Sequence, residues 1–235
     1  MKIAFIVALK GEVSIDKKLW KLRGVNWKLK SFNNNNYYSC RINNNKFFLF
    51  FSKVGKANAA SATSILINCL KVDNIINVGS AGTLSNKLTG EDLCIVNNAY
   101  YSDADATGFK YAMNQIPQEP IIYTTSKKLN LLVYKIIGNK FNFRIHHDIE
   151  LATSDSFVTN KNKNRLHIFA TTDIVDMEGA SILQIANHYK NINVTLIKFV
   201  SDGAKSKYNT KQWDYNVVDI RYDATKIIAE IIDNV

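Results

Sequence analysis

Short, strand-like segments rich in apolar residues recur along the chain and constrain its fold more than any other feature. The first, residues 3–9, is a continuous apolar run, and later strand candidates cover 74–78 and 194–201. A short run without polar alternation, such as the first, is typical of a strand that is buried on both faces. Segments with the helical spacing of apolar residues lie between and after these runs, at 55–70, 127–137, 180–189 and 217–232. The alternation predicts a three-layer α/β/α fold with a mainly parallel, mixed central sheet.

Two local departures from this alternation are predicted near the start of the chain. Gly11 is expected to turn the chain into a helix that ends near Leu22. Residues 26–51 are expected to form two or three short antiparallel strands with Asn-rich turns. Because 235 residues with 46% hydrophobic content can bury one substantial core, residues 1–235 are expected to form a single domain.

The cysteines and the apolar runs indicate the compartment. Cys40, Cys69 and Cys94 are odd in number and lack C-x-x-C spacing, which predicts neither a disulfide framework nor a zinc knuckle. The first residues have no signal-peptide layout, and no apolar run reaches the roughly 18 residues of a membrane helix. We therefore expect a soluble protein of the reducing cytoplasm that has no membrane partner.

The net charge of +10 and the pI of about 9.4 raise the question of nucleic-acid binding. The lysines are scattered along the chain, and neither an arginine-rich helix nor an RNP-like aromatic motif is present. This distribution indicates a general compositional bias, and nucleic acid is not expected as a partner.

Three acidic residues follow predicted strands. Glu12 comes after the first apolar run, Glu178 follows 174–177, and Asp202 directly follows the strand candidate at 194–201. Singly, such acids are most often helix caps or partners of a helix dipole. The carboxyl ends of strands line the ligand crevice of an open α/β sheet, so the three acids can converge in an active site.

Two further motifs have weaker meaning by themselves. Gly79-Ser80-Ala81-Gly82 follows a predicted strand, where its glycines allow close approach of a ligand to the backbone, although any tight turn after a strand could have this composition. His146-His147-Asp148 has the composition of a metal site, but neighbouring histidines on a strand point to opposite faces. No metal site is expected.

Taken together, the motifs are far more specific than any of them singly. They occur in the order Glu12, Ser52-Lys53-Val54-Gly55-Lys56, Asn77-Val78-Gly79-Ser80-Ala81-Gly82, Asp103-Ala104-Asp105-Ala106-Thr107, Gln115-Ile116-Pro117, Ser154-Asp155-Ser156-Phe157, Asp176-Met177-Glu178-Gly179-Ala180 and Val200-Ser201-Asp202. Over essentially the whole chain this series resembles the 5′-methylthioadenosine/S-adenosylhomocysteine nucleosidases of the purine nucleoside phosphorylase superfamily. The resemblance implies a nucleoside phosphorylase-like fold, a nucleoside substrate, a homodimer, and neither a metal nor an organic cofactor.

The resemblance also implies a task for each acid. Cleavage of an N-glycosidic bond passes through an oxocarbenium-like cation and requires protonation of the departing base. Asp202 matches the residue that protonates adenine N7, and Glu12 matches the base that activates water. Glu178 matches the ligand of the ribose hydroxyls, which also stabilises the cation.

Other positions match the substrate-binding residues of the family. Phe157 matches the aromatic residue that stacks on adenine, although by itself a Phe in an apolar run is more often core. The remaining matches are Ala8, Leu9, Ser80, Val158, Met177, Lys198 and Ser201, with Val54, Ala106, Phe109 and Tyr111 at the 5′-alkylthio pocket and Pro117 where a neighbouring subunit closes it. An aromatic residue within 208–215 is expected to cover the site, and Trp213 is the preferred one.

Two positions depart from the family's pattern. Lys198 replaces an arginine and lacks its planar fork, which predicts weaker orientation of Glu178. Lys10 stands where the family has an acid, and it would lower the pKa of Glu12 if it pointed inward. The sequence leaves open the range of 5′-substituents, a phosphate-dependent phosphorylase, and a nucleoside- or nucleic-acid-binding protein that has lost catalysis.

Overall fold

Strand β1 (Lys2–Val7) lies in the middle of the molecule and sends alternate side chains into two separate hydrophobic cores. In this computed structural model, residues 1–15, 18–33, 35–90, 92–138, 140–141, 144–204, 206–218 and 224–235 are described. Ala4 and Ile6 of β1 belong to one core, whereas Ile3, Phe5 and Val7 belong to the other. A strand that is buried on both faces explains why its sequence is continuously apolar.

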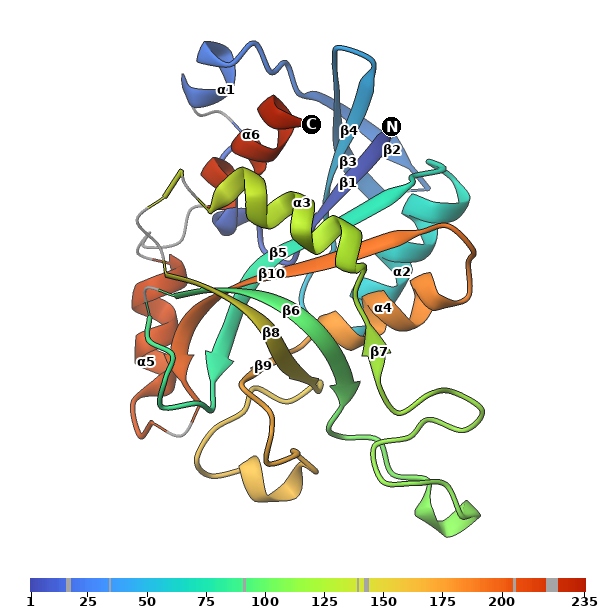
Figure 1. Ribbon diagram of the computed structural model, residues 1–235, viewed down its shortest axis with the longest axis vertical. Coiled ribbons are helices and arrows are strands. Elements are labelled where there is room, and N and C mark those ends of the chain that lie inside the picture. The colour runs from blue at the N-terminus through green and yellow to red at the C-terminus, as the bar shows by residue number, and fades with distance from the viewer. Residues whose placement is uncertain are drawn as a thin grey trace.

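Helices cover both faces of the sheet (Figure 1). Helices α2 (Lys56–Asn68) and α4 (Gly179–Asn187) pack on the first core. Helices α1 (Lys18–Leu22), α3 (Lys127–Ile137) and α6 (Ala224–Asn234) contribute to the second. The predicted three-layer α/β/α fold is therefore confirmed.

The sheet is parallel in its centre and antiparallel at its edges. Strands β4 (Asn45–Phe51) and β5 (Asn74–Thr83) flank β1 in parallel, and β10 (Asn193–Gly203) continues the parallel order beside β5. Strands β2 (Lys28–Phe32) and β3 (Asn35–Ile42) extend the other edge in antiparallel order. The antiparallel excursion predicted at 26–51 is thus confirmed with three strands.

The other half of the sheet curls back on itself. Strands β6 (Asp92–Tyr101), β8 (Arg144–Thr153) and β9 (Ile174–Asp176) pair in that order, β9 also pairs with β5, and β6 also pairs with β10. Because β10 pairs with β5 as well, these strands form a closed circuit. The short strand β7 (Tyr123–Thr124) adds to the free end of β6.

Short helical segments occupy several connections. They are η1 (Lys10–Glu12), η2 (Thr107–Phe109), η3 (Lys163–Arg165), α5 (Asn209–Trp213) and η4 (Asp214–Val218). No helix within the described part of the chain is long and apolar enough to cross a membrane.

One sequence-based expectation about local structure was wrong. The helix expected from Gly11 to Leu22 is divided, since η1 ends at Glu12 and residues 13–15 are not helical; α1 is described from Lys18, and residues 16 and 17 lie outside the described residues. Gly79 to Gly82, which were expected to follow the strand at 74–78, continue it as part of β5, because β10 and β9 supply hydrogen-bond partners there. The helix expected at 217–232 begins at Ala224 as described, and residues 219–223 lie outside the described residues.

Candidate active site

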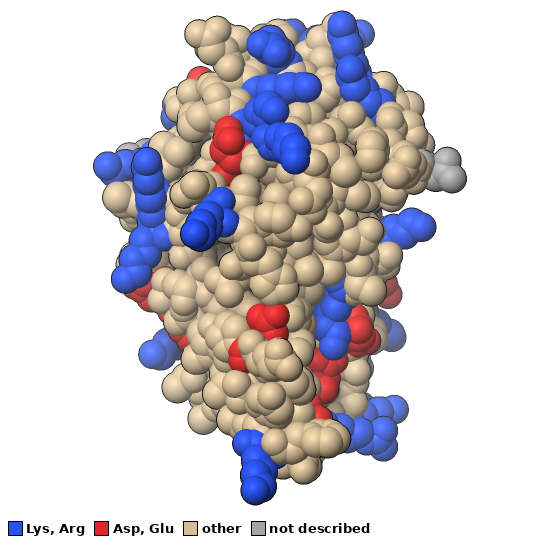
Figure 2. Space-filling view, turned by 90° about the vertical axis from the view of Figure 1, so that its right-hand side faces the viewer, with Lys and Arg blue, Asp and Glu red and all other residues tan. Residues whose placement is uncertain are grey.

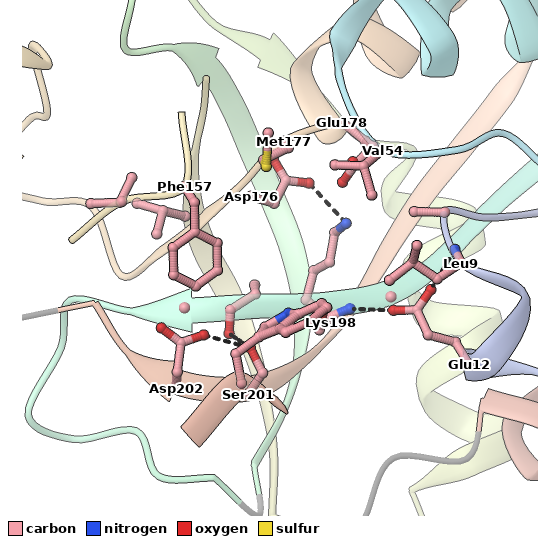
Figure 3. A pocket seen from close by; sticks show the side chains of 18 of the residues that line it. Leu9, Glu12, Val54, Phe157, Asp176, Met177, Glu178, Lys198, Ser201 and Asp202 are labelled. Atoms are coloured by element: carbon pink, nitrogen blue, oxygen red, sulfur yellow. Dashed lines mark hydrogen bonds and ion pairs between the residues drawn. The ribbon is translucent and has the colours of Figure 1, made fainter. Parts of the chain in front are cut away.

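A pocket of about 240 Å³ opens where β1, β5, β9 and β10 end, at the carboxyl edge of the parallel sheet. It brings together most of the predicted site residues, which are Ala8, Leu9, Glu12, Val54, Ser80, Phe157, Val158, Met177, Glu178, Lys198, Ser201 and Asp202. Figure 3 shows Asp202 beside Phe157 at one end of this pocket and Glu12 at the other, with Glu178 and Met177 on a further side. The convergence of the three acids is thus present in the folded chain.

Glu12 ends η1, and both of its carboxylate oxygens accept hydrogen bonds. Oε2 accepts from the backbone N–H of Leu9 at 3.1 Å, and Oε1 accepts from that of Ser80 at 3.3 Å. Glu12 is 5% exposed, and burial raises the pKa of its carboxyl, although the two N–H donors and Lys198 oppose that rise. Lys10, considered above as a cation near Glu12, is exposed, and the cation that acts on this carboxyl is Lys198. A carboxyl with a raised pKa is a better proton acceptor.

Glu178 immediately precedes α4 and is oriented by a donor from a distant loop. Its Oε1 accepts a hydrogen bond from the backbone N–H of Gly55 at 2.9 Å. Burial, followed by the nearby Asp176 carboxylate, raises the pKa of Glu178 to about 7, whereas Lys198 and the Gly55 N–H act to lower it. At neutral pH this side chain therefore divides between its neutral and ionised forms.

Lys198 lies on β10 and is 1% exposed. Its acidic neighbours are Asp176, Glu178 and Glu12. Burial by itself lowers the pKa of an ammonium group, but the carboxylates outweigh that effect and raise the pKa of Lys198. Lys198 forms its ion pair with Asp176. The ammonium group thus remains charged and reduces the repulsion among three buried carboxyls.

Asp202 occupies the last part of β10, where the pairing with β5 contains a bulge between Val200 and Asp202. The hydroxyl of Ser201 donates to Asp202 Oδ1 at 2.7 Å. Burial raises the pKa of Asp202 to about 6, while hydrogen bonds from Ser201 and Asn209 oppose the rise. A Cβ at Gly82 would stand 3.1 Å from Asp202 Oδ2, so a side chain at this position of β5 would crowd the Asp202 carboxyl.

Aromatic side chains line the end of the pocket that holds Asp202. The rings of Phe157 and Trp213 meet edge to face, with centroids 6.4 Å apart and an interplanar angle of 81°. The indole N–H of Trp213 donates to Ser80 Oγ at 3.4 Å, which places Trp213 over the strand that carries Ser80. Tyr208 and Tyr215 are more than half exposed and do not line the pocket. Of the aromatic residues at 208–215, Trp213 is thus the one that reaches the site.

Comparison with known proteins places this pocket in a family. Residues 2–233 match the family model of the phosphorylase superfamily. A 5′-methylthioadenosine/S-adenosylhomocysteine nucleosidase of Buchnera aphidicola subsp. Schizaphis graminum is 31% identical over 237 residues, which cover 100% of this chain and 97% of the relative. The nucleosidase of the same name from Maridesulfovibrio salexigens is 34% identical over 205 residues, with 86% of each chain covered. The chain belongs to this nucleosidase family.

Solved structures agree with the assignment. The nucleosidase of S. pneumoniae in complex with a transition-state inhibitor superimposes with a TM-score of 0.84 at 27% identity, covering 100% of this chain and 99% of the other. The nucleosidase of Neisseria meningitidis in complex with methylthio-immucillin-A gives a TM-score of 0.84 at 26% identity, with the same coverage. The family and the nucleoside phosphorylase-like fold predicted from the ordered motifs are confirmed.

Four predicted residues do not line the pocket of the single nucleosidase chain. Ala106, Phe109, Tyr111 and Pro117 all lie on the connection between β6 and β7, which projects at the lower end of Figure 1 around η2. Phe109 is 83% exposed. The predicted place of Ala106, Phe109 and Tyr111 beside the 5′-substituent, and of Pro117 where a neighbouring subunit closes the pocket, stays a prediction.

Several further residues shape the nucleosidase site, and the reasoning from sequence assigned no individual role to them. Gly55 supplies the donor to Glu178, Asp176 pairs with Lys198, and Asn77 lines the pocket floor. Asn209 donates to the backbone oxygen of Val158 at 2.8 Å and hydrogen-bonds Asp202. Gly55, Asn77 and Asp176 each lie within one of the ordered motifs, and that position was the available signal, whereas Asn209 lies in none of them.

The histidine motif holds no metal cluster. Within the part of the chain that is described, no group of three or more His, Cys, Asp or Glu side chains is arranged to hold a metal ion. His146 lies 3.4 Å from Asp92, and His147 contacts its neighbour Asp148. The two histidines thus face different partners.

Proposed function

We propose that this protein hydrolyses the N-glycosidic bond of 5′-methylthioadenosine and S-adenosylhomocysteine, releasing adenine and the 5-thioribose product. The observation that carries the proposal is a pair of buried carboxyls with raised pKa values, Asp202 and Glu12, at opposite ends of one pocket. A nucleoside that spans the pocket would meet an acid at its base and a general base at its sugar. Family membership supports the same substrates, since the related nucleosidases carry them in their names.

In the proposed reaction Asp202 acts as the general acid. Its pKa of about 6 leaves a useful fraction of the carboxyl protonated near neutral pH, and Ser201 fixes one oxygen. The proton passes from Asp202 to N7 of the purine as the bond between C1′ and N9 breaks. The electron pair of that bond leaves with adenine, and the ribosyl group becomes an oxocarbenium-like cation.

Glu12 acts as the general base on the other side of the sugar. It removes a proton from a water molecule while the oxygen of that water bonds to C1′. Formation of this C1′–O bond completes the hydrolysis. The hydrogen bonds from Leu9 and Ser80 hold the carboxylate in place during this step. Preorganised groups of this kind avoid the cost of reorientation in the transition state.

Glu178 binds the ribose hydroxyls in its ionised form. The N–H of Gly55 occupies Oε1, which leaves Oε2 to accept from the sugar. Its negative charge also stabilises the cation that develops at the ribose ring. The side chains of Met177 and of the exposed Val54 complete the apolar surroundings of the sugar and its 5′-substituent.

A phosphorylase would place inorganic phosphate where the nucleosidase places water. Among the described residues that line the pocket, Lys198 is the one cation, and its ammonium group is already paired with Asp176. Phosphate binding calls for several free donors. We expect adenine release from 5′-methylthioadenosine that is independent of added phosphate. A phosphate requirement together with a ribose 1-phosphate product would instead establish the phosphorylase.

A nucleic-acid-binding protein without catalysis is less well supported by the surface. Figure 2 shows one face of the molecule, on which Lys and Arg side chains are spread from top to bottom and acidic side chains interrupt them in the lower half. Lysines also pair with acids within the fold, as Lys56 does with Asp103. Weak duplex binding at physiological salt is the expected result of a mobility-shift measurement.

We further propose that the active protein is a homodimer. Phe109 is 83% exposed, and Ile122 on the same connection is 46% exposed, so apolar surface is available for a second copy. Ala106, Tyr111 and Pro117 lie on this connection as well. Sedimentation velocity is expected to give twice the mass of 26.6 kDa, and Phe109→Glu is expected to give the monomer mass. A monomeric wild type with full activity would contradict the proposal.

The free thiols support the cytoplasm as the working compartment. Cys40, Cys69 and Cys94 are all unpaired, and Cys40 and Cys94 are buried. Unpaired thiols are usual in a reducing compartment. Detection of the protein in the cytoplasmic fraction of its cell is the corresponding measurement.

A further inference from the structure

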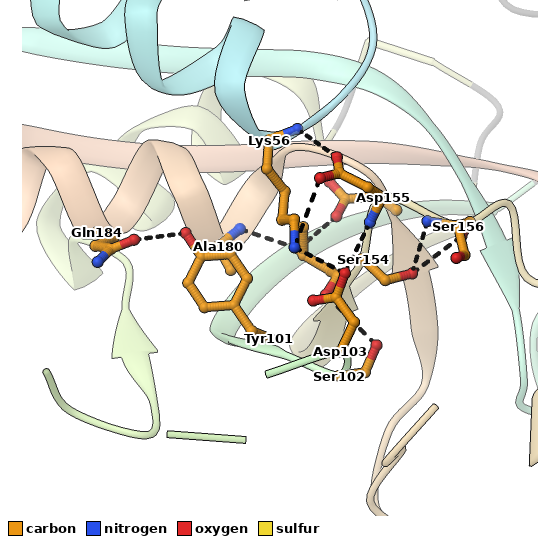
Figure 4. Close-up of polar contacts among 11 residues, drawn as sticks. Lys56, Tyr101, Ser102, Asp103, Ser154, Asp155, Ser156, Ala180 and Gln184 are labelled. Carbon is orange, nitrogen blue, oxygen red and sulfur yellow. Dashed lines mark hydrogen bonds and ion pairs between the residues drawn. The ribbon is translucent and has the colours of Figure 1, made fainter. Parts of the chain in front are cut away.

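Lys56 is the centre of a polar network that lies beside the active-site pocket but outside its lining (Figure 4). Its ammonium group lies 2.7 Å from Asp103 Oδ2 and 3.6 Å from Asp155 Oδ2. The ammonium group also stands 5.3 Å from the centre of the Tyr101 ring. The Tyr101 hydroxyl in turn donates to Gln184 of α4 at 2.7 Å. One cation therefore connects groups from four different segments.

The network joins the loops that carry the site. Asp103 follows β6 and leads into the connection with Phe109, whereas Asp155 follows β8 and lies two residues before Phe157. The backbone N–H of Asp155 donates to Asp103 Oδ2 at 3.1 Å, so both loops meet at one oxygen. Lys56 contributes the charge that lets two carboxylates share this position.

The third loop is that of Lys56 itself, and it holds Glu178. The backbone N–H of Lys56 donates to Asp155 Oδ1 at 2.9 Å, and the N–H of the preceding Gly55 donates to Glu178. Gly55 has a φ of 104°, and a Cβ there would stand 3.2 Å from Asp155 Oδ1. The two successive N–H groups thus donate to Glu178 and Asp155. The direction in which the Gly55 N–H points therefore depends on the position of Asp155.

We infer that Lys56 is a positioning residue of the nucleosidase reaction. Through Asp103 and Asp155 it holds the Gly55 N–H in hydrogen-bond distance of Glu178, and it holds the loop of Phe157 in place against the purine base. Lys56 does not line the pocket and acts through these groups. The inference deepens the proposed function and rests on it, because it concerns the geometry of the same pocket.

Loss of the ammonium charge has a defined consequence. Asp103 Oδ1 is buried and has no hydrogen-bond partner among the described residues, so Lys56 is the main compensation for this carboxylate. Without the cation, Asp103 and Asp155 repel each other and the loops separate. Glu178 then loses its N–H donor, while burial and the Asp176 and Glu12 carboxylates still raise its pKa and Lys198 still lowers it.

The pH dependence therefore distinguishes positioning from a purely structural role. Glu178 must be ionised to accept the ribose hydroxyls, so kcat/KM falls as the pH drops through its pKa. Since the Gly55 hydrogen bond lowers that pKa, losing it moves the acidic limb of the profile to higher pH. A general loss of folded protein would lower the whole profile without moving the limb.

The experiment compares Lys56→Met, which keeps the length of the side chain, with Lys56→Arg, which keeps its charge. For Lys56→Met we expect kcat/KM for 5′-methylthioadenosine to fall on the order of 10- to 100-fold and its acidic limb to move to higher pH. Lys56→Arg is expected to recover most of the activity and the position of the limb. Asp103→Asn should reproduce the shift of Lys56→Met, and Lys226→Met, at an exposed position of α6, should behave as wild type.

A binding measurement adds a readout that does not depend on turnover. Titration with adenine, followed by the fluorescence of Trp213, is expected to give weaker binding for Lys56→Met because Asp155 holds the loop of Phe157. The inference is overturned if Lys56→Met leaves both the acidic limb and adenine binding unchanged. It is also overturned if Lys56→Arg fails to restore both. Absence of adenine release by the wild-type protein would instead overturn the proposed function, so the two failures are distinguishable.

Discussion

Lys198 Nζ lies 2.8 Å from Asp176 Oδ2, and both side chains are 1% exposed. Asp176 also accepts hydrogen bonds from the Thr153 hydroxyl at 2.6 Å and from the Gly179 N–H at 2.8 Å. The lysine that replaces the family's arginine is therefore the counter-ion of Asp176, while the Gly55 N–H orients Glu178. The weaker orientation of Glu178 expected from this replacement stays a prediction, although a backbone donor holds one of its carboxylate oxygens.

Removal of the Lys198 charge is expected to destabilise the fold strongly. Lys198→Met leaves Asp176 buried and uncompensated, a situation that costs about 3 to 5 kcal/mol of unfolding free energy. Lys198→Arg keeps the charge and is expected to cost much less. Urea unfolding of both variants measures the difference, and equal midpoints for Lys198→Met and wild type would show that the pair contributes nothing.

Asp202→Asn is expected to lower turnover of 5′-methylthioadenosine by at least roughly 10²-fold, because an amide cannot donate the proton that adenine needs. The similar shape of Asn should leave binding of a non-hydrolysable adenosine analogue within a few-fold of wild type. Steady-state kinetics together with a fluorescence titration separate the two effects. A variant with wild-type turnover would favour a binding protein without catalysis.

The pH profile of kcat/KM is expected to be bell-shaped with its maximum between pH 6 and pH 7. Glu178, with a pKa of about 7, must lose its proton, so activity falls on the acidic side. Asp202, with a pKa of about 6, must keep its proton, so activity falls on the alkaline side. Glu178→Gln should leave an acidic limb set by Glu12 alone, the other carboxyl that must be ionised, and Asp202→Asn should remove the alkaline limb. Limbs that stay in place in these variants would assign the titrations to other groups.

Stability is expected to decrease as the pH rises through the neutral range. The folded protein holds a proton on Glu178 up to a pKa of about 7, whereas the unfolded chain releases it near the ordinary value of 4.5. The folded state thus binds more protons between these values, and the resulting stabilisation is present below 4.5 and is lost as the pH passes 7. Unfolding free energies measured in urea from pH 5 to pH 8 should fall less steeply for Glu178→Gln than for wild type. Parallel curves for the two proteins would contradict this linkage.

Much of the fold was predictable because its signals are local. A continuous apolar run marks a strand that is buried on both faces, and β1 forms at such a run. The spacing of apolar residues likewise predicts α3, whose bounds Lys127–Ile137 agree with the expected 127–137. The divided helix after Gly11 was not predictable, since it depends on the docking of Glu12 against Ser80.

The sequence by itself determined the acids, their order and the family. Glu12 and Glu178 follow strands and Asp202 lies at the end of one, and parallel topology brings such positions together whatever their separation in the chain. The tertiary structure decided how each acid is held. Gly55 reaches Glu178 across 123 positions, and Ser80 reaches Glu12 across 68. Such contacts, and the burial that raises the pKa values, arise only when distant strands pair, so no local pattern records them.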